Sequence, residues 1–486
     1  MKYSCLLYAL LLWGTVSFCH AQPHLTTKPL IIQGQLTHCT ESYLILAFEN
    51  EYGITEMDTI PVDSTGRFYL KTFKVAAPTL ANIQKHATQI NDLFVAPGYE
   101  LTITGDATNY KTLLASKKIT GKGAESNRFQ LLVDSILYAR NDTIGWYDKQ
   151  EADLLAYVAD FKKLRDSLAG KVFNHKSVND PYLEYFGKVV RTNNKLAGLY
   201  FLMVHTEIRN LDYHQTQAFI KQHFDTTILN NLFVPEYMLS PMYTNWLMSA
   251  QYLSHSERLE KLQHPDAKLS KYYKLDKILN TYKDPIKQLV LYRQLTSQIG
   301  KCKTFEDTKD FKNKMAVYLE AVQNPVYAQQ LDTRLAERTA ELVRTQIGKP
   351  APAFTLPSNT GKTWSLSDFK GKVVYMDLWA SWCGPCRAET PALKALYSKY
   401  KNNDSLAIIS ISVSDGKKEW EKALAEDKPE WLQLLDADNV VGKTYVARFI
   451  PQFVLIDKQG NMVSNSAPVP SKAEELEQLL AQELAK

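Results

Sequence analysis

Along the chain, the pattern of apolar and polar positions changes twice. In its first part, short runs such as Leu30–Ile32 and Tyr43–Leu46 are separated by turn clusters at Asp63–Gly66 and Pro97–Gly98. Short apolar runs between such turns are typical of strands. The pattern predicts a β-rich N-terminal domain over residues 22–118, built as a small antiparallel sandwich or barrel.

From residue 119 to residue 345 the apolar positions recur at helical spacing. One such helix face is formed by Leu183, Phe186, Val189 and Val190. This spacing places the four side chains on one side of a helix. Several prolines divide the region, which predicts an all-helical middle region made of many separate helices; they are Pro181, Pro235, Pro241, Pro265, Pro285 and Pro325.

Past Gly348–Pro352 the pattern alternates between strands and helices. The predicted strands are Val373–Trp379, Leu406–Val413 and Phe453–Ile456, and the predicted helices are Pro385–Tyr400, Glu419–Glu426 and Ser471–Leu484. Ser471 and Glu474 match a capping box at the start of the last helix. Alternating strands and helices predict a three-layer α/β domain over residues 346–486, so the chain is multidomain.

The first residues predict export. Met1–Lys2 is a short basic start, Leu6–Val16 is apolar, and Cys19–Ala21 ends on a small residue. This order is typical of a secretory signal peptide, here residues 1–21, and the apolar run is too short to span a membrane. Lipidation of Cys19, which would leave an N-terminal membrane tether, is an alternative, but the bulky Phe18 before it fits that poorly. The expected location is the periplasm or cell envelope.

Composition and charge exclude several functions. The formal net charge is +5 over 486 residues, and lysines and arginines are spread among acids, so no nucleic-acid partner is predicted. All ten histidines lie before residue 265 and the chain has a single CxxC pair, which predicts no metal site. There is no flavin or nicotinamide fingerprint, so no cofactor is expected.

The cysteines are few but two are paired. Of the six, Cys39 and Cys302 are isolated, two lie in the leader, and Cys383 and Cys386 form a CxxC motif between a predicted strand and a predicted helix. Backbone N–H groups and the dipole at a helix N-terminus stabilise an anion, and a thiolate is the nucleophile in disulfide exchange. This position predicts Cys383 as the exposed attacking thiolate. Cys386, one turn further on and more buried, is predicted to resolve the mixed disulfide.

These residues resemble a known family. Asp377–Cys386 is similar to thioredoxin, and the wider pattern resembles the TlpA-type exported thiol–disulfide reductases, through Pro350–Leu356, Leu366–Lys372 and Cys386–Pro391. The resemblance implies a thioredoxin fold for residues 346–486 and a redox-active disulfide between Cys383 and Cys386. Residues 27–118 resemble more loosely the β-rich domains fused in front of such reductases.

The resemblance also implies roles for other residues. Asp377 matches the buried carboxylate that accepts the proton of the resolving cysteine, a role for which burial raises the pKa of an aspartate. Pro451 after Ile450 matches the cis-proline that binds substrate together with Trp382. Thioredoxin pairs the acid with a lysine on the next strand, and the predicted strand Leu406–Val413 contains none.

The predicted function is that of an exported protein thiol–disulfide oxidoreductase, more a reductase than an oxidase. Its partners would be protein thiols and disulfides and an upstream electron donor, for which a membrane thiol relay is the candidate. A thiol peroxidase is an alternative, but it needs a lone reactive cysteine, which the CGPC pair argues against. A partner-binding scaffold formed by residues 27–345 is a second alternative.

Overall fold

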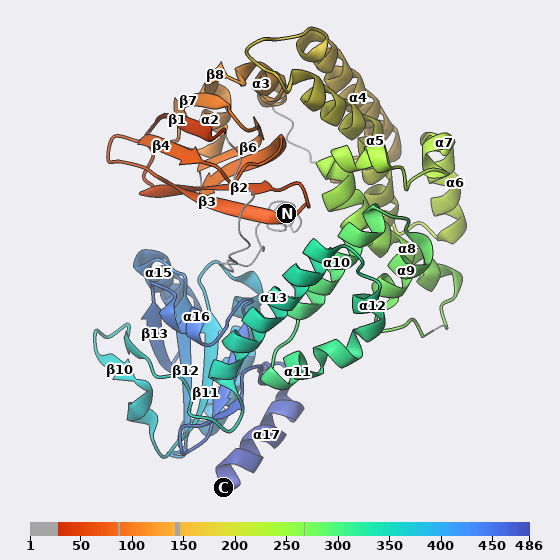
Figure 1. Cartoon of the computed structure of the whole chain (residues 1–486). Coiled ribbons are helices and arrows are strands. Elements are labelled where there is room, and N and C mark those ends of the chain that lie inside the picture. The colour runs from red at the N-terminus through yellow and green to blue at the C-terminus, as the bar shows by residue number, and fades with distance from the viewer. Residues whose placement is uncertain (1–27, 86–87, 141–145, 267) are drawn as a thin grey trace. The chain divides into compact units, whose positions relative to one another are not determined.

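The computed structural model describes residues 28–85, 88–140, 146–266 and 268–486 (Figure 1). The predicted signal peptide therefore lies outside the described residues. The chain divides into two compact units: the part up to Gln294 with Glu320–Ala328, and Leu295–Leu319 with Gln329–Lys486. Within the described ranges, no helix has the length and apolarity that crossing a membrane requires.

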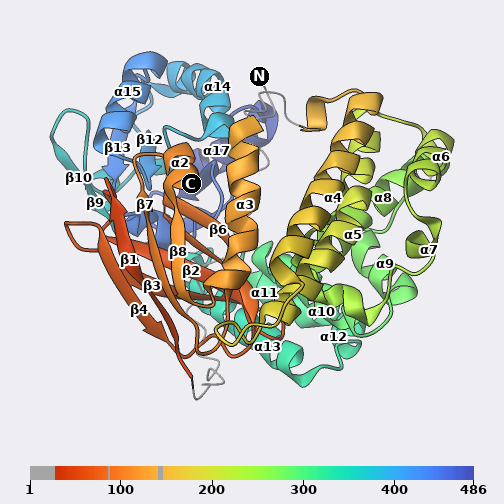
Figure 2. The ribbon, with the colours of Figure 1, turned by 90° about the horizontal axis from the view of Figure 1, so that it is seen from above.

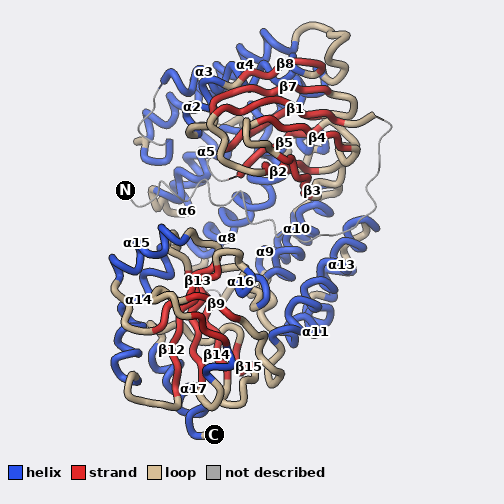
Figure 3. Tube along the Cα trace, turned by 90° about the vertical axis from the view of Figure 1, so that its left-hand side faces the viewer, coloured by secondary structure: helices blue, strands red, loops and turns tan. Residues whose placement is uncertain are grey.

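The first unit begins with two four-stranded sheets, which confirms the β-rich N-terminal region. Their strand orders are β4-β1-β7-β8, shown in that sequence from bottom to top in Figure 3, and β3-β2-β5-β6. Strand β1 runs parallel to β7, so the predicted purely antiparallel arrangement is wrong for this pair. The strands are β1 (Leu30–Thr37), β2 (Tyr43–Glu49), β3 (Thr55–Pro61), β4 (Arg67–Thr72), β5 (Thr79–Lys85), β6 (Thr88–Val95), β7 (Glu100–Asp106) and β8 (Lys118–Lys122).

Helices follow the sheets in the first unit, as the helical spacing predicts. The predicted face of Leu183, Phe186 and Val190 is buried in the same core as the strands, where the Phe186 ring lies 4.6 Å from that of Phe94. Helices α4 and α5 pack side by side (Figure 2). The elements are α2 (Tyr110–Ser116), α3 (Ala124–Arg140), η1 (Trp146–Asp148), α4 (Glu151–Phe173), α5 (Leu183–Ile208), α6 (Tyr213–His223), α7 (Thr226–Leu229), η2 (Pro235–Leu239), η3 (Met242–Gln251), α8 (Tyr252–Gln263), α9 (Tyr273–Thr281) and α10 (Ile286–Gly300), of which α10 continues into the second unit from Leu295 on.

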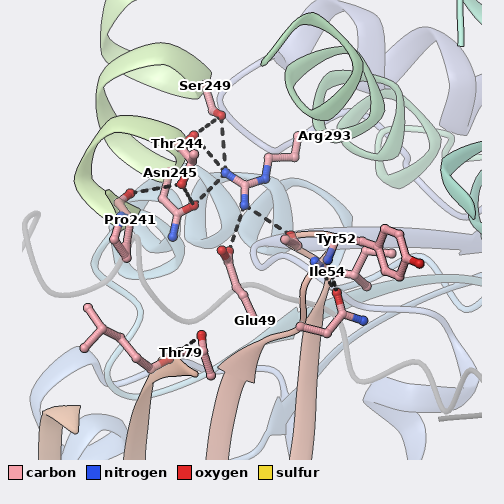
Figure 4. Close-up of polar contacts among 12 residues, drawn as sticks. Glu49, Tyr52, Ile54, Thr79, Pro241, Thr244, Asn245, Ser249 and Arg293 are labelled. Carbon is pink, nitrogen blue, oxygen red and sulfur yellow. Dashed lines mark hydrogen bonds and ion pairs between the residues drawn. The ribbon is translucent and has the colours of Figure 1, made fainter. Parts of the chain in front are cut away.

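Arg293 of α10 joins the β2–β3 turn to these helices (Figure 4). Its Nη2 lies 2.9 Å from Glu49 Oε1 and donates to the Gly53 carbonyl oxygen at 3.1 Å. Its Nη1 donates to the Thr244 carbonyl oxygen at 2.8 Å and to the side chain of Asn245 at 2.6 Å. The last two acceptors belong to η3, a π-helical segment, so one guanidinium connects three elements that are far apart in sequence.

The second unit holds a five-stranded sheet of order β13-β12-β11-β14-β15. Strands β11 to β13 are parallel, and β14 and β15 are antiparallel to their neighbours. Its elements are α11 (Phe305–Lys314), α12 (Ala316–Glu320), α13 (Pro325–Leu342), η4 (Val343–Thr345), β9 (Thr355–Pro357), β10 (Thr363–Ser365), η5 (Leu366–Phe369), β11 (Val373–Trp379), α14 (Gly384–Tyr400), β12 (Leu406–Val413), α15 (Lys417–Asp427), β13 (Leu432–Asp436), α16 (Val440–Thr444), β14 (Gln452–Ile456), β15 (Met462–Ser464) and α17 (Ala473–Ala485); α12 and α13 also reach into the segment Glu320–Ala328.

Strand β11 is the centre of this sheet. All seven of its residues are buried, and alternate side chains enter two different cores. Val374 and Met376 join the core that includes Val441 of α16, whereas Tyr375 joins the core that includes Leu393 of α14. The sheet is therefore covered on both faces, which agrees with the predicted three-layer α/β domain and explains the continuous apolar run in the sequence.

The capping box predicted for the last helix is wrong. Helix α17 begins at Ala473 with Lys472 as its N-cap, and Lys472 makes no side-chain cap. The Ser471 hydroxyl and amide instead donate to the Glu389 carboxylate, at 2.8 and 2.9 Å. The Ser471 hydroxyl and amide therefore serve a tertiary contact to Glu389 of α14, and helix α17 begins without a side-chain cap.

Arg293→Met should lower the free energy of unfolding of the first unit by about 2 kcal/mol, because it leaves the part-buried acceptors of Arg293 without a charged donor. Lys188→Met is the matched control, since its ion pair with Glu184 is exposed, and should change stability by less than about 0.5 kcal/mol. Urea denaturation would measure both. Equal effects of the two substitutions on the free energy of unfolding would show that Arg293 does not stabilise the connection between the β2–β3 turn and η3.

Candidate active site

The CGPC motif lies where strand β11 gives way to helix α14. Cys383 is the N-cap of α14, and Gly384 and Pro385 are its first residues. Proline costs no hydrogen bond at this position, because its missing N–H would have no partner within the helix. The Cys386 amide donates to Cys383 Sγ at 3.2 Å. The helix start therefore places a backbone donor on the sulfur of the first cysteine.

The two cysteines form a disulfide with an S–S distance of 1.99 Å. Cys383 is 5% exposed and Cys386 is 6% exposed, so the prediction that Cys383 is the more exposed of the two is wrong for this oxidised state. The reason is that both belong to an apolar cluster with Trp379, Trp420 and Leu435. The backbone donor on Cys383 Sγ, rather than exposure, distinguishes the two sulfurs.

The residues predicted to bind substrate lie beside this disulfide. Cys383 Sγ is 3.8 Å from the carbonyl oxygen of Ile450. The peptide bond between Ile450 and Pro451 is cis, as the resemblance implies. Trp382 is 58% exposed, and its indole N–H donates to the Ser414 carbonyl oxygen at 3.3 Å. The structure thus brings the disulfide and the proline loop together, with an exposed aromatic ring next to Cys383 in the chain.

Asp377 is buried in the middle of the sheet. It lies opposite Ser410 of β12 and Phe453 of β14. Burial raises the pKa of its carboxyl group to about 7; the hydrogen bond from Ser410 opposes this shift, and the nearby Glu389 carboxylate adds to it. The Ser410 hydroxyl donates to Asp377 at 2.9 Å and accepts from the Trp431 indole at 2.8 Å. Ser410 therefore contacts the acid from the strand on which the sequence lacks a lysine, and Trp431 in turn donates to Ser410.

Two acidic residues of the site are missing from the sequence predictions. Glu389 follows Cys386 by one helical turn, and this spacing is the signal that could have revealed it. Asp415 accepts hydrogen bonds from the Ser381 amide and hydroxyl and from the Ser412 hydroxyl, each at 2.7 Å. It thereby fixes the segment that leads into Cys383. No sequence spacing links Asp415 to Ser381, since the contact joins two separate loops.

A metal centre has no support in the part of the chain that the structure describes. No group of three or more histidine, cysteine, aspartate or glutamate side chains there could hold an ion.

Comparisons with known proteins agree with this site. The Redoxin family model matches residues 346–480. The thiol-disulfide oxidoreductase ResA of Bacillus thuringiensis subsp. konkukian is 33% identical over 135 residues, which are 28% of this chain and 77% of that protein. ResA of Bacillus subtilis is 31% identical over 24% of this chain and 64% of its own length. The chain belongs to the ResA family of thiol–disulfide oxidoreductases.

A solved structure is also similar to this oxidoreductase in sequence. It is the thioredoxin domain of a thiol-disulfide oxidoreductase from Bacteroides vulgatus, 33% identical, covering 28% of this chain and 96% of that one with a TM-score of 0.26. The family match lies within the last 141 residues of the oxidoreductase, so residues up to 345 fall outside it.

Asp377→Asn should stabilise the oxidised protein at pH 8. Between pH 4 and pH 7 the aspartate ionises in the unfolded chain, where its pKa is near 3.8, while the folded chain still binds the proton, so stability falls as pH rises. Asparagine does not ionise, and the variant should gain up to about 4 kcal/mol over the wild type at pH 8 but little at pH 4. Denaturation at both pH values measures this. A difference that is the same at pH 4 and pH 8 would contradict the raised pKa.

Proposed function

We propose that this chain is an exported reductase of protein disulfides that works through Cys383 and Cys386. The observation that carries the proposal is the placement of Cys383 Sγ at the start of helix α14, where it accepts the Cys386 amide. Such a donor and the helix dipole stabilise the thiolate over the thiol. This hydrogen bond supports Cys383 as the attacking sulfur.

In the reduced enzyme, the Cys383 thiolate attacks one sulfur of a substrate disulfide. A mixed disulfide forms, and the other substrate sulfur leaves as a thiolate. Cys386 then loses its proton and attacks Cys383 Sγ, which releases the second substrate thiolate and leaves the Cys383–Cys386 disulfide that the structure contains. Two electrons pass from the enzyme dithiol to the substrate in this sequence.

Asp377 is proposed to accept the proton of Cys386. A group with a pKa of about 7 is divided between its two protonation states at neutral pH, which is the best condition for giving and taking a proton. In the CGPC site Ser410, which accepts a hydrogen bond from Trp431, contacts this acid in place of a lysine, and the Glu389 carboxylate favours the protonated form of the acid. The relay would thus rest on burial and hydrogen bonds within the second unit.

Substrate is proposed to bind along the Ile450–Pro451 segment. The Ile450 carbonyl oxygen lies next to Cys383 Sγ, so an extended substrate segment pairing with this backbone would bring its own disulfide to the attacking sulfur. Trp382 would cover the apolar side chains of that segment. The substrate-binding part of the chain is then the edge of the sheet at which β11 ends and β14 begins.

An electron donor and the two N-terminal domains would complete the proposed function. A membrane thiol relay would return electrons to the disulfide, because the chain has no fingerprint of its own for a flavin or nicotinamide. Residues 346–486 form the catalytic domain in this proposal, and residues 22–118 and 119–345 are the β-rich and helical domains, with a partner-binding role as their candidate function. The family match does not include these two domains, so their role is proposed separately from that of the catalytic domain.

Cys386→Ser should trap substrate, and Cys383→Ser should not. Without the Cys386 thiol, no second thiol of the active site can attack Cys383 Sγ and release the substrate. Covalent mixed disulfides should therefore accumulate and appear on non-reducing gels and in mass spectra. Cys383→Ser should also abolish the reduction of insulin disulfides by dithiothreitol catalysed by the enzyme. Trapping by Cys383→Ser alone would reverse the two roles, and full activity of that variant would refute the proposed function.

Export predicts where the mature chain begins. Signal peptidase acts after a small residue, here Ala21, so N-terminal sequencing of the protein from its own cells should start at Gln22. A start at a lipidated Cys19 would establish the tethered alternative. Folded protein that retains Met1 would contradict export.

A further inference from the structure

A carboxylate outside the family match contacts the loop that ends in the active-site proline. Glu341 lies in the last turn of α13, five residues before the match begins at residue 346. Its Oε2 is 2.5 Å from Arg448 Nη2. Arg448 precedes Ile450 by two residues, and the Ile450 carbonyl oxygen is the group beside Cys383 Sγ. All of these residues belong to the second unit.

A second arginine fixes Glu341 in place. Arg338, one turn earlier on α13, donates from Nη1 to the same Oε2 at 3.1 Å. Its Nε and Nη2 donate to the Cys302 carbonyl oxygen at 3.1 and 2.6 Å. The side chain of Arg338 is only 6% exposed. Arg338 therefore holds the Glu341 carboxylate in position independently of Arg448 and its loop.

The two guanidinium groups need the carboxylate between them. Both guanidinium groups contact Glu341 Oε2, Arg448 at 2.5 Å and Arg338 at 3.1 Å, so the two cations lie close together. Burial lowers the pKa of Arg338, and the charge of Arg448 lowers it further. Like charges that converge without a counterion repel strongly when they are shielded from water. Loss of the Glu341 charge would thus push Arg448 away from α13, and not only remove one attraction.

The loop itself, residues Tyr445–Pro451, has a backbone that must be held. Val446 has a φ of +56°, a left-handed conformation that is rare and costly for a β-branched residue. Hydrogen bonds from the Ala447 amide to Gly442 at 2.7 Å and from Gln452 Nε2 to Tyr445 at 3.0 Å restrain the two ends. Contacts that reach the loop from outside include Asn465 Nδ2, which donates to the Tyr445 carbonyl oxygen at 3.0 Å, and Glu341 of α13, which contacts the Arg448 side chain.

We propose that Glu341 is a positioning residue of the oxidoreductase: through Arg448 it sets the Tyr445–Pro451 loop against Cys383 and thereby determines how well substrate is captured. The inference rests on the proposed function for its catalytic consequence, because the loop matters to catalysis only if substrate binds along Ile450 and Pro451. It assigns to the helical region a direct part in the site, which the family match does not include.

The test is Glu341→Gln in the full chain, which keeps the size of the side chain and removes its charge. Amide hydrogen exchange in the Tyr445–Arg448 segment should become about tenfold faster without substrate, the effect of losing one charge-assisted hydrogen bond. With insulin as the disulfide substrate and dithiothreitol as reductant, KM should rise about tenfold while kcat stays within twofold, since the cysteines are untouched.

The control is Asp332→Asn, which removes another acid of α13. Asp332 pairs with Lys312 at 2.8 Å, and both side chains are more than 60% exposed, so neither readout should move. Glu341→Asp, which keeps the charge on a shorter stem, should give intermediate values and serves if Glu341→Gln melts at a much lower temperature.

The outcomes separate this inference from the proposed function. Unchanged loop exchange in Glu341→Gln overturns the positioning role whatever the enzyme does. Faster exchange with an unchanged KM overturns the link to substrate capture. If Cys383→Ser remains active, the proposed function fails, and loop exchange, measured without substrate, still decides whether Glu341 holds the loop.

Discussion

The end of strand β11 and the start of helix α14 form one junction, and the positions of Asp377, Cys383 and Cys386 follow from it. The strand is buried on both faces and cannot shift without disturbing two cores. It therefore fixes the position of Asp377 along the sheet and the residue at which the chain enters helix α14. Cys383 as N-cap and Cys386 one turn on then have little freedom, and the backbone donor on Cys383 Sγ comes from the helix geometry alone.

Much of this junction could be predicted from the sequence because its causes are local. A continuous apolar run, a CxxC pair and a proline at the first helical turn specify strand, helix and sulfur positions without knowledge of distant residues. The same holds for the face of Leu183, Phe186 and Val190, whose helical spacing alone indicates a buried side. The resemblance to thioredoxin added Asp377 and the cis peptide bond at Pro451, which spacing could not supply.

What the sequence could not indicate are contacts between elements far apart in the chain. Ser471 matches a local capping pattern, yet it bonds to Glu389, 82 residues earlier. Ser410 contacts Asp377 from the strand on which a lysine was sought, because strand register brings Ser410 opposite the acid. The nearly equal burial of Cys383 and Cys386 also depends on Trp420, which a different helix contributes. Each of these requires the tertiary structure.

Helix α13 has a consequence for how this enzyme can be divided. A boundary drawn at residue 346, where the family similarity starts, cuts the chain between Glu341 and the arginine that Glu341 contacts 107 residues later. A fragment that begins at that point would keep Cys383 and Cys386 and lose the carboxylate that contacts Arg448. The contacts of this module therefore extend upstream of residue 346, into a helix that the family match leaves out.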